Sequence, residues 1–231
     1  MKKKTIVITG GSGRFGKYLK GLNTKFKILF PQKKELNILN AQKIQKYLTL
    51  KKPDILIHLA GLSRPMNIHE KVIEKSIDLN IIGTANITKI CSKLNIKLIY
   101  FSTNYVYPGA KGNYSEKDPL LPVNNYAWSK LGGESSVQLY KNSLILRVCM
   151  TEKPFVHKKA FANMKTNFMF QENLAKNLYK LINQKGIINI GGKIQSVYNF
   201  AKKYNPQVKK ILVSKSQQKY FPLNSTMDVS K

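Results

Sequence analysis

The sequence contains few of the residues from which proteins build disulfides and metal sites. Its 231 residues include two cysteines and three histidines. Cys91 and Cys149 both lie in apolar segments, so we interpret them as buried free thiols in a reducing cytoplasm, where disulfides are rare. The three histidines lack the close spacing of metal ligands, and we predict that the protein binds no metal.

Long apolar runs are missing as well. The sequence has no stretch of about 18 apolar residues, which a membrane-spanning helix requires. Residues 5–9 are apolar and follow three lysines, but this segment is too short for the hydrophobic part of a signal peptide and leads directly into glycines. We therefore expect a cytoplasmic protein without a membrane partner.

Acidic residues are scarce. Eleven Asp and Glu stand against 40 Lys and Arg, which gives a net charge of +29. Such a charge attracts polyanions, but proteins that bind nucleic acid specifically favour arginine and interleaved aromatic residues. Here only Arg14, Arg64 and Arg147 are arginines, and the lysines form no long block. We interpret the charge as a compositional bias and predict no specific nucleic-acid partner; whether the charge has a function of its own stays open.

The apolar segments that are present alternate with helical patterns. Strands are expected at 4–9, 26–30, 53–61, 96–102 and 143–148, with a further short strand at 186–190. Strands that alternate with helices form a doubly wound parallel sheet, so we predict an α/β Rossmann fold with helices on both faces. The pattern becomes irregular after residue 148. We therefore predict a core over residues 1–148 and a C-terminal region packed on it over residues 149–231.

Three further residues give local signals. Asn40 is expected to cap a helix that begins at residue 41. Asn80 interrupts a long helical pattern, which predicts a kink with a packing or functional cause. His58 lies in the apolar third strand, and we expect a structural role for it rather than a catalytic one.

A glycine-rich turn follows the first strand. Residues 10–16 read GGSGRFG, with glycines spaced three apart between a strand and a helix. Gly10 permits a tight turn, Gly13 lets a pyrophosphate approach the backbone, and Gly16 lets the helix pack closely on the strand. This arrangement predicts a dinucleotide site. The second strand is followed by lysines instead of an acidic residue, and together with Arg14 they favour NADP slightly over NAD.

Tyr126 and Lys130 lie four residues apart on one face of a predicted helix. Such a pair alone is no more than a helix-surface pattern, but it follows a strand that ends in Ser102 and Thr103. An ammonium group favours the phenolate and lowers the pKa of a neighbouring tyrosine. The combination predicts proton transfer by Tyr126 beside a nicotinamide that supplies hydride, with Thr103 bonded to the substrate carbonyl.

Five motifs in chain order resemble those of the extended short-chain dehydrogenase/reductases, which act mainly on nucleotide sugars. They are TGGSGRFG, DILIHLAG, NIIGTAN, FSTNYVYPG and PVNNYAWSKLGGE. The segments ELNILN, STNYVYPG and PLNSTMDVSK are similar to the dTDP-4-dehydrorhamnose reductase-like branch. Asn37 and Asn104 stand where that branch usually has aspartate. The segment between Arg147 and Gly186 is shorter than in that branch, so we expect a reduced substrate-binding region over 149–231.

The resemblance implies an NAD(P)H-dependent reductase of a 4-keto nucleotide sugar, active in polysaccharide biosynthesis, and allows a homodimer. Thr103, Tyr126 and Lys130 would be catalytic, with Lys130 also bonded to the nicotinamide ribose. Substrate contacts are implied for Thr103, Asn104, Tyr105 and Arg147. Cofactor contacts within the NAD(P)-binding core are implied for Gly10, Ser12, Gly13, Arg14, Phe15, Gly16, Asn37, Ile38, Leu59, Ala60, Gly61, Asn80, Ser102, Tyr126 and Lys130.

Two alternatives to this reductase stay open. One is an NAD-dependent nucleotide-sugar epimerase that keeps its cofactor bound. The other is a cofactor-binding regulatory or scaffold subunit without turnover. The retained Thr103, Tyr126 and Lys130 favour catalysis, and the absence of an Asp-Glu pair after Thr103 argues against a dehydratase.

Overall fold

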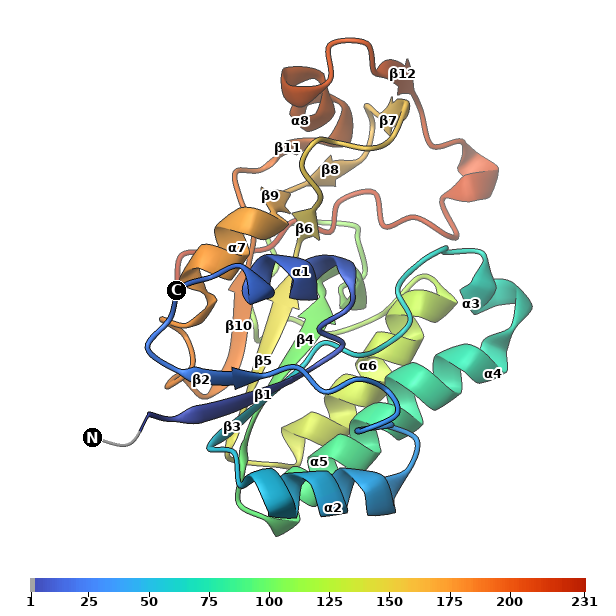
Figure 1. Cartoon of the computed structure of the whole chain (residues 1–231). Coiled ribbons are helices and arrows are strands. Elements are labelled where there is room, and N and C mark those ends of the chain that lie inside the picture. Colours follow the sequence, from blue (N-terminus) through green and yellow to red (C-terminus); the bar gives the residue numbers. More distant parts are fainter. Residues whose placement is uncertain (1–2) are drawn as a thin grey trace.

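A parallel sheet of six strands forms the centre of the molecule (Figure 1). The computed structural model describes residues 3–231 and orders these strands β10-β5-β4-β3-β1-β2. Their bounds are Thr5–Thr9 for β1, Lys27–Leu29 for β2, Ile55–His58 for β3, Lys97–Thr103 for β4, Ser143–Val148 for β5 and Gly186–Ile190 for β10. The predicted doubly wound parallel sheet is confirmed, and the short strand at 186–190 is its sixth member, parallel to β5.

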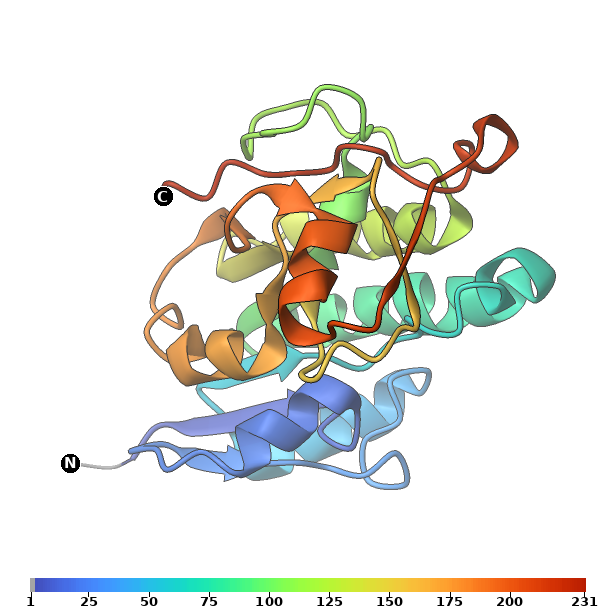
Figure 2. The ribbon, with the colours of Figure 1, turned by 90° about the horizontal axis from the view of Figure 1, so that it is seen from above.

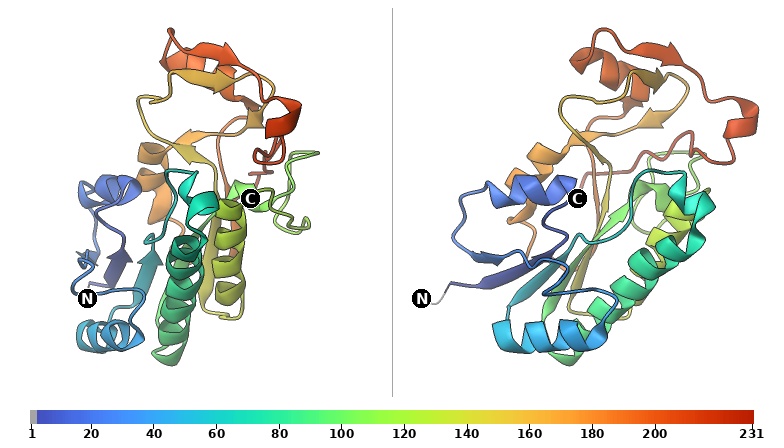
Figure 3. Two further views of the ribbon diagram at one scale, coloured as in Figure 1. Left: turned by 90° about the vertical axis from the view of Figure 1, so that its right-hand side faces the viewer. Right: turned by 45° about the vertical axis from the view of Figure 1, so that its right-hand side comes forward.

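Helices cover both faces of the sheet (Figure 3). One face carries α1 (Arg14–Lys20) and α7 (Gln171–Leu178), and the other carries α2 (Ala41–Lys51), α5 (Gly83–Lys93) and α6 (Asn125–Gln138). Successive side chains of a strand point to opposite faces of the sheet. One strand rich in β-branched residues therefore contributes apolar side chains to the hydrophobic cores on both faces. Within residues 3–231, no helix has the length and apolar character needed to cross a bilayer.

Two of the predicted local features are confirmed. The Asn40 side chain accepts a hydrogen bond from the Lys43 backbone N–H at 2.8 Å and so caps α2. His58 is buried between the hydroxyls of Thr9 (2.8 Å) and Thr84 (3.2 Å). Burial lowers its pKa to about 3, so His58 is a neutral structural residue. Both cysteines are buried free thiols, as predicted.

The expected kink at Asn80 has a defined geometry. The short helices α3 (Ile68–Lys71) and α4 (Ile73–Ser76) lead into a π-helical segment, η1 (Ile77–Ile82), which continues as α5. Single π-helical turns often mark functional positions. The buried Asn80 side chain accepts from the Leu62 N–H at 2.7 Å and donates to the Leu62 carbonyl and the Ser129 hydroxyl. One amide therefore joins the loop after β3 to helix α6.

The C-terminal region lies over the carboxyl ends of the strands (Figures 1 and 2). It contains short paired strands and α8 (Val197–Tyr204), whose first turn is capped by Ser196. The strand pairs are β6 (Met150–Thr151) with β9 (Met169–Phe170), β7 (Lys159–Phe161) with β12 (Lys209–Ile211), and β8 (Lys165–Thr166) with β11 (Gln195–Ser196). An aromatic cluster around Phe155, Phe170 and Phe200 forms its own small core.

Residues 3–231 also contain two 3₁₀ turns. One is η2 (Asn104–Val106), directly after β4, and the other is η3 (Lys215–Gln217), in the C-terminal region. The tail then runs beside the loop that leaves β4, where Tyr114 pairs with Met227 (Figure 2). Two elements that follow residue 148 are part of the core. Helix α7 packs on the core beside α1, and β10 completes the central sheet.

Candidate active site

A cavity of about 1050 Å³ separates the carboxyl ends of the strands from the C-terminal region. Its walls come from the glycine turn, the loop after β3, the end of β4, helix α6 and the C-terminal region. The topology brings together most of the residues that the sequence singled out. Those that line the cavity are Gly10, Gly13, Arg14, Phe15, Gly16, Leu59, Gly61, Asn80, Ser102, Thr103, Asn104, Tyr105, Tyr126 and Lys130.

The glycine turn is tightly packed against its surroundings. Gly10 has a φ of +70°, and a Cβ atom there would lie 2.6 Å from the Ala60 backbone nitrogen. A Cβ atom at Gly16 would lie 2.6 Å from the Gly11 Cα. Both distances are too short for any side chain. The glycines therefore let β1, α1 and the loop after β3 meet at the sheet edge, where the strand order reverses.

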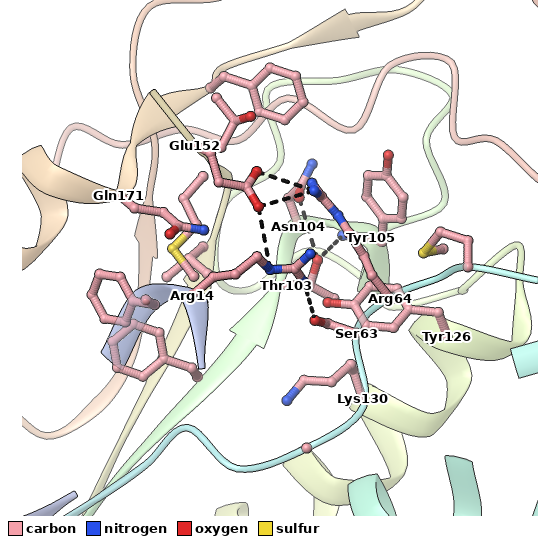
Figure 4. Close-up of a pocket in the computed structure, with 18 of the residues that line it drawn as sticks. Arg14, Ser63, Arg64, Thr103, Asn104, Tyr105, Tyr126, Lys130, Glu152 and Gln171 are labelled. Carbon is pink, nitrogen blue, oxygen red and sulfur yellow. Dashed lines mark hydrogen bonds and ion pairs between the residues drawn. The ribbon is translucent and has the colours of Figure 1, made fainter. Parts of the chain in front are cut away.

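Tyr126 lies at the start of α6 and faces the end of β4. Helix α6 is capped by Asn124, which accepts from the Ala127 N–H at 2.9 Å. The Tyr126 ring meets His69 and Tyr105 edge-on, with ring centroids 5.1 and 6.3 Å away. Figure 4 shows Thr103, Tyr126 and Lys130 on the same wall of the cavity.

The pKa of Tyr126 is raised, because burial penalises the phenolate. A hydrogen bond with Thr103 and the positive charges of Arg64 and Arg14 oppose this shift without overcoming it. Lys130 is not among the groups that lower the pKa of Tyr126, so that predicted effect of Lys130 stays a prediction. Tyr126 is a neutral phenol at neutral pH, which suits a proton donor.

Lys130 is half-buried one helical turn beyond Tyr126. Its ammonium nitrogen lies 4.2 Å from the centroid of the Tyr100 ring, a cation–π contact, while the Tyr100 hydroxyl donates to the Lys130 carbonyl at 3.0 Å. Burial lowers the pKa of Lys130 to about 7, and the charge of Glu134 works in the opposite direction. The residue can therefore gain or lose a proton near neutral pH.

Arg147 does not line the cavity, which gives no support to its predicted contact with a substrate. It is 2% exposed, and its guanidinium lies 2.6 Å from Glu134 in a buried ion pair. It also donates to the Tyr107 hydroxyl at 2.8 Å. Glu134 in turn accepts from the Ser102 hydroxyl, so the pair fastens β4 and β5 to α6. Breaking a buried ion pair on one side is strongly destabilising, which indicates a structural role for Arg147.

Four further residues of the predicted cofactor set lie outside the cavity. Ser12 is exposed, and Ala60 abuts Gly10. Asn37 accepts from the Leu39 N–H, while Ile38 is buried with its side chain close to Gly83. Cofactor contacts at these four positions stay predictions.

Sequence reasoning missed a cluster of charged residues in the cavity (Figure 4). Glu152, which follows β6, accepts two hydrogen bonds of 3.1 Å from Arg64 and lies 3.3 Å from Arg14. Arg14 also donates to the Ser63 hydroxyl at 2.8 Å. Its side chain is therefore held inside the cavity by Ser63 and Glu152, and these contacts add no support to the expected preference for a 2′-phosphate. Only the rarity of arginine in this lysine-rich chain could have drawn attention to Arg64.

The C-terminal region contributes an apolar wall that the sequence did not reveal. Its lining residues are largely aromatic or aliphatic, among them Met150, Phe155, Phe161, Met164, Phe168, Val197 and Phe221. Polar side chains interrupt this wall, namely Thr151, Glu152, His157, Lys159 and, at the start of α7, Gln171. Apolar walls with a few polar groups are typical of small-molecule sites.

Comparison with protein families gives a match to the RmlD substrate binding domain over residues 3–182. Methionine adenosyltransferase 2 subunit beta of Xenopus tropicalis is 31% identical over 156 residues, which cover 63% of this chain and 46% of that protein. A dTDP-4-dehydrorhamnose reductase of Aggregatibacter actinomycetemcomitans is 28% identical over 151 residues, 63% of this chain and 51% of the enzyme. The chain thus spans about half the length of the curated relatives it matches.

Solved structures extend the likeness over the whole chain. The dTDP-4-dehydrorhamnose reductase of Bacillus anthracis, determined in complex with NADP, superposes with a TM-score of 0.86 at 25% identity. The match covers 100% of this chain and 91% of that one. The part of the chain that the curated relatives do not cover, including the C-terminal region, therefore also has a fold similar to that of a reductase.

Proposed function

We propose, because the chain belongs to the RmlD substrate-binding domain family, that it is an NAD(P)H-dependent reductase of a 4-keto nucleotide sugar. The observation that carries the proposal is the convergence of the glycine turn, Thr103, Tyr126 and Lys130 on one cavity. These groups come from three separate elements, and a protein without a dinucleotide or a proton to transfer has no need to gather them. The reductase relatives and the NADP-bound neighbour support the same function.

The residues of the cavity fit a nicotinamide dinucleotide. Gly10 and Gly16 let the turn pack closely, and the absence of a side chain at Gly13 lets a pyrophosphate approach the backbone there. Asn80 holds the loop after β3, which forms another part of the cavity wall. When bound, the cofactor supplies hydride to the carbonyl carbon of the sugar. NADP has slight support over NAD from the neighbour, whereas the contacts of the Arg14 side chain add none.

Thr103 and Tyr126 bind the carbonyl oxygen of the substrate and transfer the proton to it. The Thr103 hydroxyl at the end of β4 hydrogen-bonds the keto oxygen and aligns it with the Tyr126 phenol. Tyr126, whose pKa is raised, carries a proton at neutral pH and donates it to the oxygen as negative charge develops there. Lys130 bonds the nicotinamide ribose and, when protonated, favours the phenolate left behind. Asn104 and Tyr105 contact the sugar.

A cofactor-binding subunit without turnover is the second candidate. It is favoured by the name of the Xenopus tropicalis relative, which describes a subunit of another enzyme. A nucleotide-sugar epimerase is a further alternative, since it needs the same Thr103, Tyr126 and Lys130. The three functions differ in their use of cofactor: a reductase consumes it, an epimerase recycles it, and a subunit without turnover does neither.

The test is a spectrophotometric assay of NADH and NADPH oxidation with a panel of 4-keto nucleotide sugars. We expect oxidation with at least one sugar, and loss of this activity in Tyr126→Phe by about 10²-fold or more, with cofactor binding retained. Tyr140→Phe is the matched control, because it removes a tyrosine hydroxyl that donates to the Ile96 carbonyl outside the cavity. Epimerised sugar without net oxidation would indicate the epimerase, and no turnover with intact cofactor binding would indicate the subunit.

A further inference from the structure

Two arginines in the cavity share a single carboxylate. Arg14, the first residue of α1, and Arg64, in the loop after β3, both contact the carboxylate of Glu152. The arginine side chains are 44% and 36% exposed, whereas that of Glu152 is 15% exposed. The cluster has one more positive than negative charge, and all three residues line the cavity. Its arginines are therefore accessible to a ligand that enters from the cavity.

The two arginines have the geometry of an anion-binding site, and the carboxylate of Glu152 occupies it. Both carboxylate oxygens of Glu152 accept from Arg64, and one of them also lies 3.3 Å from the Arg14 Nε. Planar guanidinium groups bind phosphate oxygens with the same fork of N–H donors that they offer to a carboxylate. The diphosphate of a nucleotide sugar or a dinucleotide carries two negative charges, one more than Glu152, and its oxygens can use the same donors.

A second observation indicates a ligand at this place. Gln171 is 6% exposed and lines the cavity, and its Oε1 atom is buried without a hydrogen-bond partner among residues 3–231. Figure 4 shows its side chain beside Arg14 and Glu152. Buried amide oxygens normally accept a hydrogen bond, so a donor from a ligand, such as a sugar hydroxyl, fits here.

We infer that Arg14 and Arg64 form a phosphate subsite, and that a phosphoryl group of the ligand displaces Glu152 from them. This inference deepens the proposed function, because the phosphoryl group belongs to the diphosphate of either the nucleotide sugar or the cofactor. Glu152 follows β6, whereas the arginines belong to the core. Release of Glu152 therefore loosens a contact between the C-terminal region and the core when a ligand binds.

The experiment is a calorimetric titration of the full chain with three probes: inorganic pyrophosphate, thymidine diphosphate and NADPH. Glu152→Gln should bind pyrophosphate about three- to tenfold more tightly than the wild type, since the competing charge is gone. Arg64→Gln should bind it about tenfold more weakly. Glu172→Gln is the matched control, because Glu172 pairs with Lys176 at the surface and its loss changes the net charge equally.

The nucleotide probes identify the source of the phosphoryl group. Tighter binding of thymidine diphosphate to Glu152→Gln assigns the subsite to the substrate, and tighter binding of NADPH assigns it to the cofactor. Equal affinities of Glu152→Gln and Glu172→Gln for all three probes overturn the inference. If thermal unfolding shows that Glu152→Gln does not fold, Arg64→Gln decides alone, and an unchanged pyrophosphate affinity overturns it. These titrations need no turnover, so they are independent of the reductase assay.

Discussion

At the scale of single residues, burial favours the neutral forms of both Tyr126 and Lys130. It raises the pKa of the phenol and lowers that of the ammonium to about 7. A raised pKa keeps Tyr126 protonated at neutral pH, which matches donation to an alkoxide in the direction of reduction. The charges that oppose the shift belong to Arg14 and Arg64, so the phenol is coupled to the same arginines that hold Glu152.

The pKa of Lys130 gives a prediction for stability. Its folded value of about 7 lies below the ordinary value of about 10.4, so between these pH values the unfolded chain binds a proton that the folded chain has lost. Lys130 therefore makes the wild type more stable as the pH rises from about 7 to about 10. Lys130→Met lacks this pH-dependent contribution. From pH 7 to pH 10 the free energy of unfolding of the wild type should therefore rise, relative to that of Lys130→Met, by on the order of 2 kcal/mol, allowing for partial exposure.

Urea unfolding at several pH values measures this difference. Lys141→Met, which removes an exposed lysine beyond α6, is the control and should differ from the wild type by the same amount at every pH. A pH-independent difference for Lys130→Met as well would contradict the lowered pKa of Lys130.

At the scale of elements, the site depends on how η1 and α6 hold the loop after β3. The Asn80 amide bonds both backbone groups of Leu62 and the hydroxyl of Ser129. A Cβ atom at Gly61 would lie 2.7 Å from the Asn80 Oδ1, so the loop lies directly on this amide. The loop then presents Ser63 and Arg64 to the cavity. The π-helical turn at Asn80 thus positions a wall of the site.

Asn80→Ala should destabilise the protein by about 1–3 kcal/mol, because it leaves the partly buried N–H of Leu62 without its acceptor and removes the buried bond to Ser129. It should also weaken pyrophosphate binding, since Arg64 loses its support. Asn177→Ala, which removes an exposed amide on α7, should change stability by less than about 0.5 kcal/mol. Chemical unfolding and calorimetry measure the two effects. If Asn80→Ala matched Asn177→Ala in both, Asn80 would not position the loop.

At the scale of the whole molecule, the core was predictable and the C-terminal region was not. The buried strands have clear apolar runs separated by helices, so their order and direction follow from general rules of α/β folds. Two-residue strands such as Met150–Thr151 show no periodicity, and their pairing depends on distant segments. Sequence therefore predicted the glycine turn, Thr103, Tyr126 and Lys130 but not the apolar wall around Phe155.

The positions of Arg147 and Arg64 in the structure have physical explanations at the same scale. Arg147 lies near a strand end, but side chains alternate along a strand, and its side chain reaches Glu134 on α6. The contact of Arg64 with Glu152 joins residues 88 positions apart. Sequence spacing carries no signal for such a pair, because only the folded C-terminal region brings Glu152 to the cavity.

Every proposed function requires a nicotinamide dinucleotide at the turn formed by residues 10–16. The most direct test is a fluorescence titration of the wild type and Gly13→Asp with NADH and NADPH. A Cβ atom at Gly13 would lie 3.1 Å from the Gly10 carbonyl, and an added carboxylate would meet the pyrophosphate. We predict saturable binding of at least one cofactor to the wild type and none to Gly13→Asp. Absence of binding to the wild type, or equal binding to both proteins, would contradict a dinucleotide site at this turn.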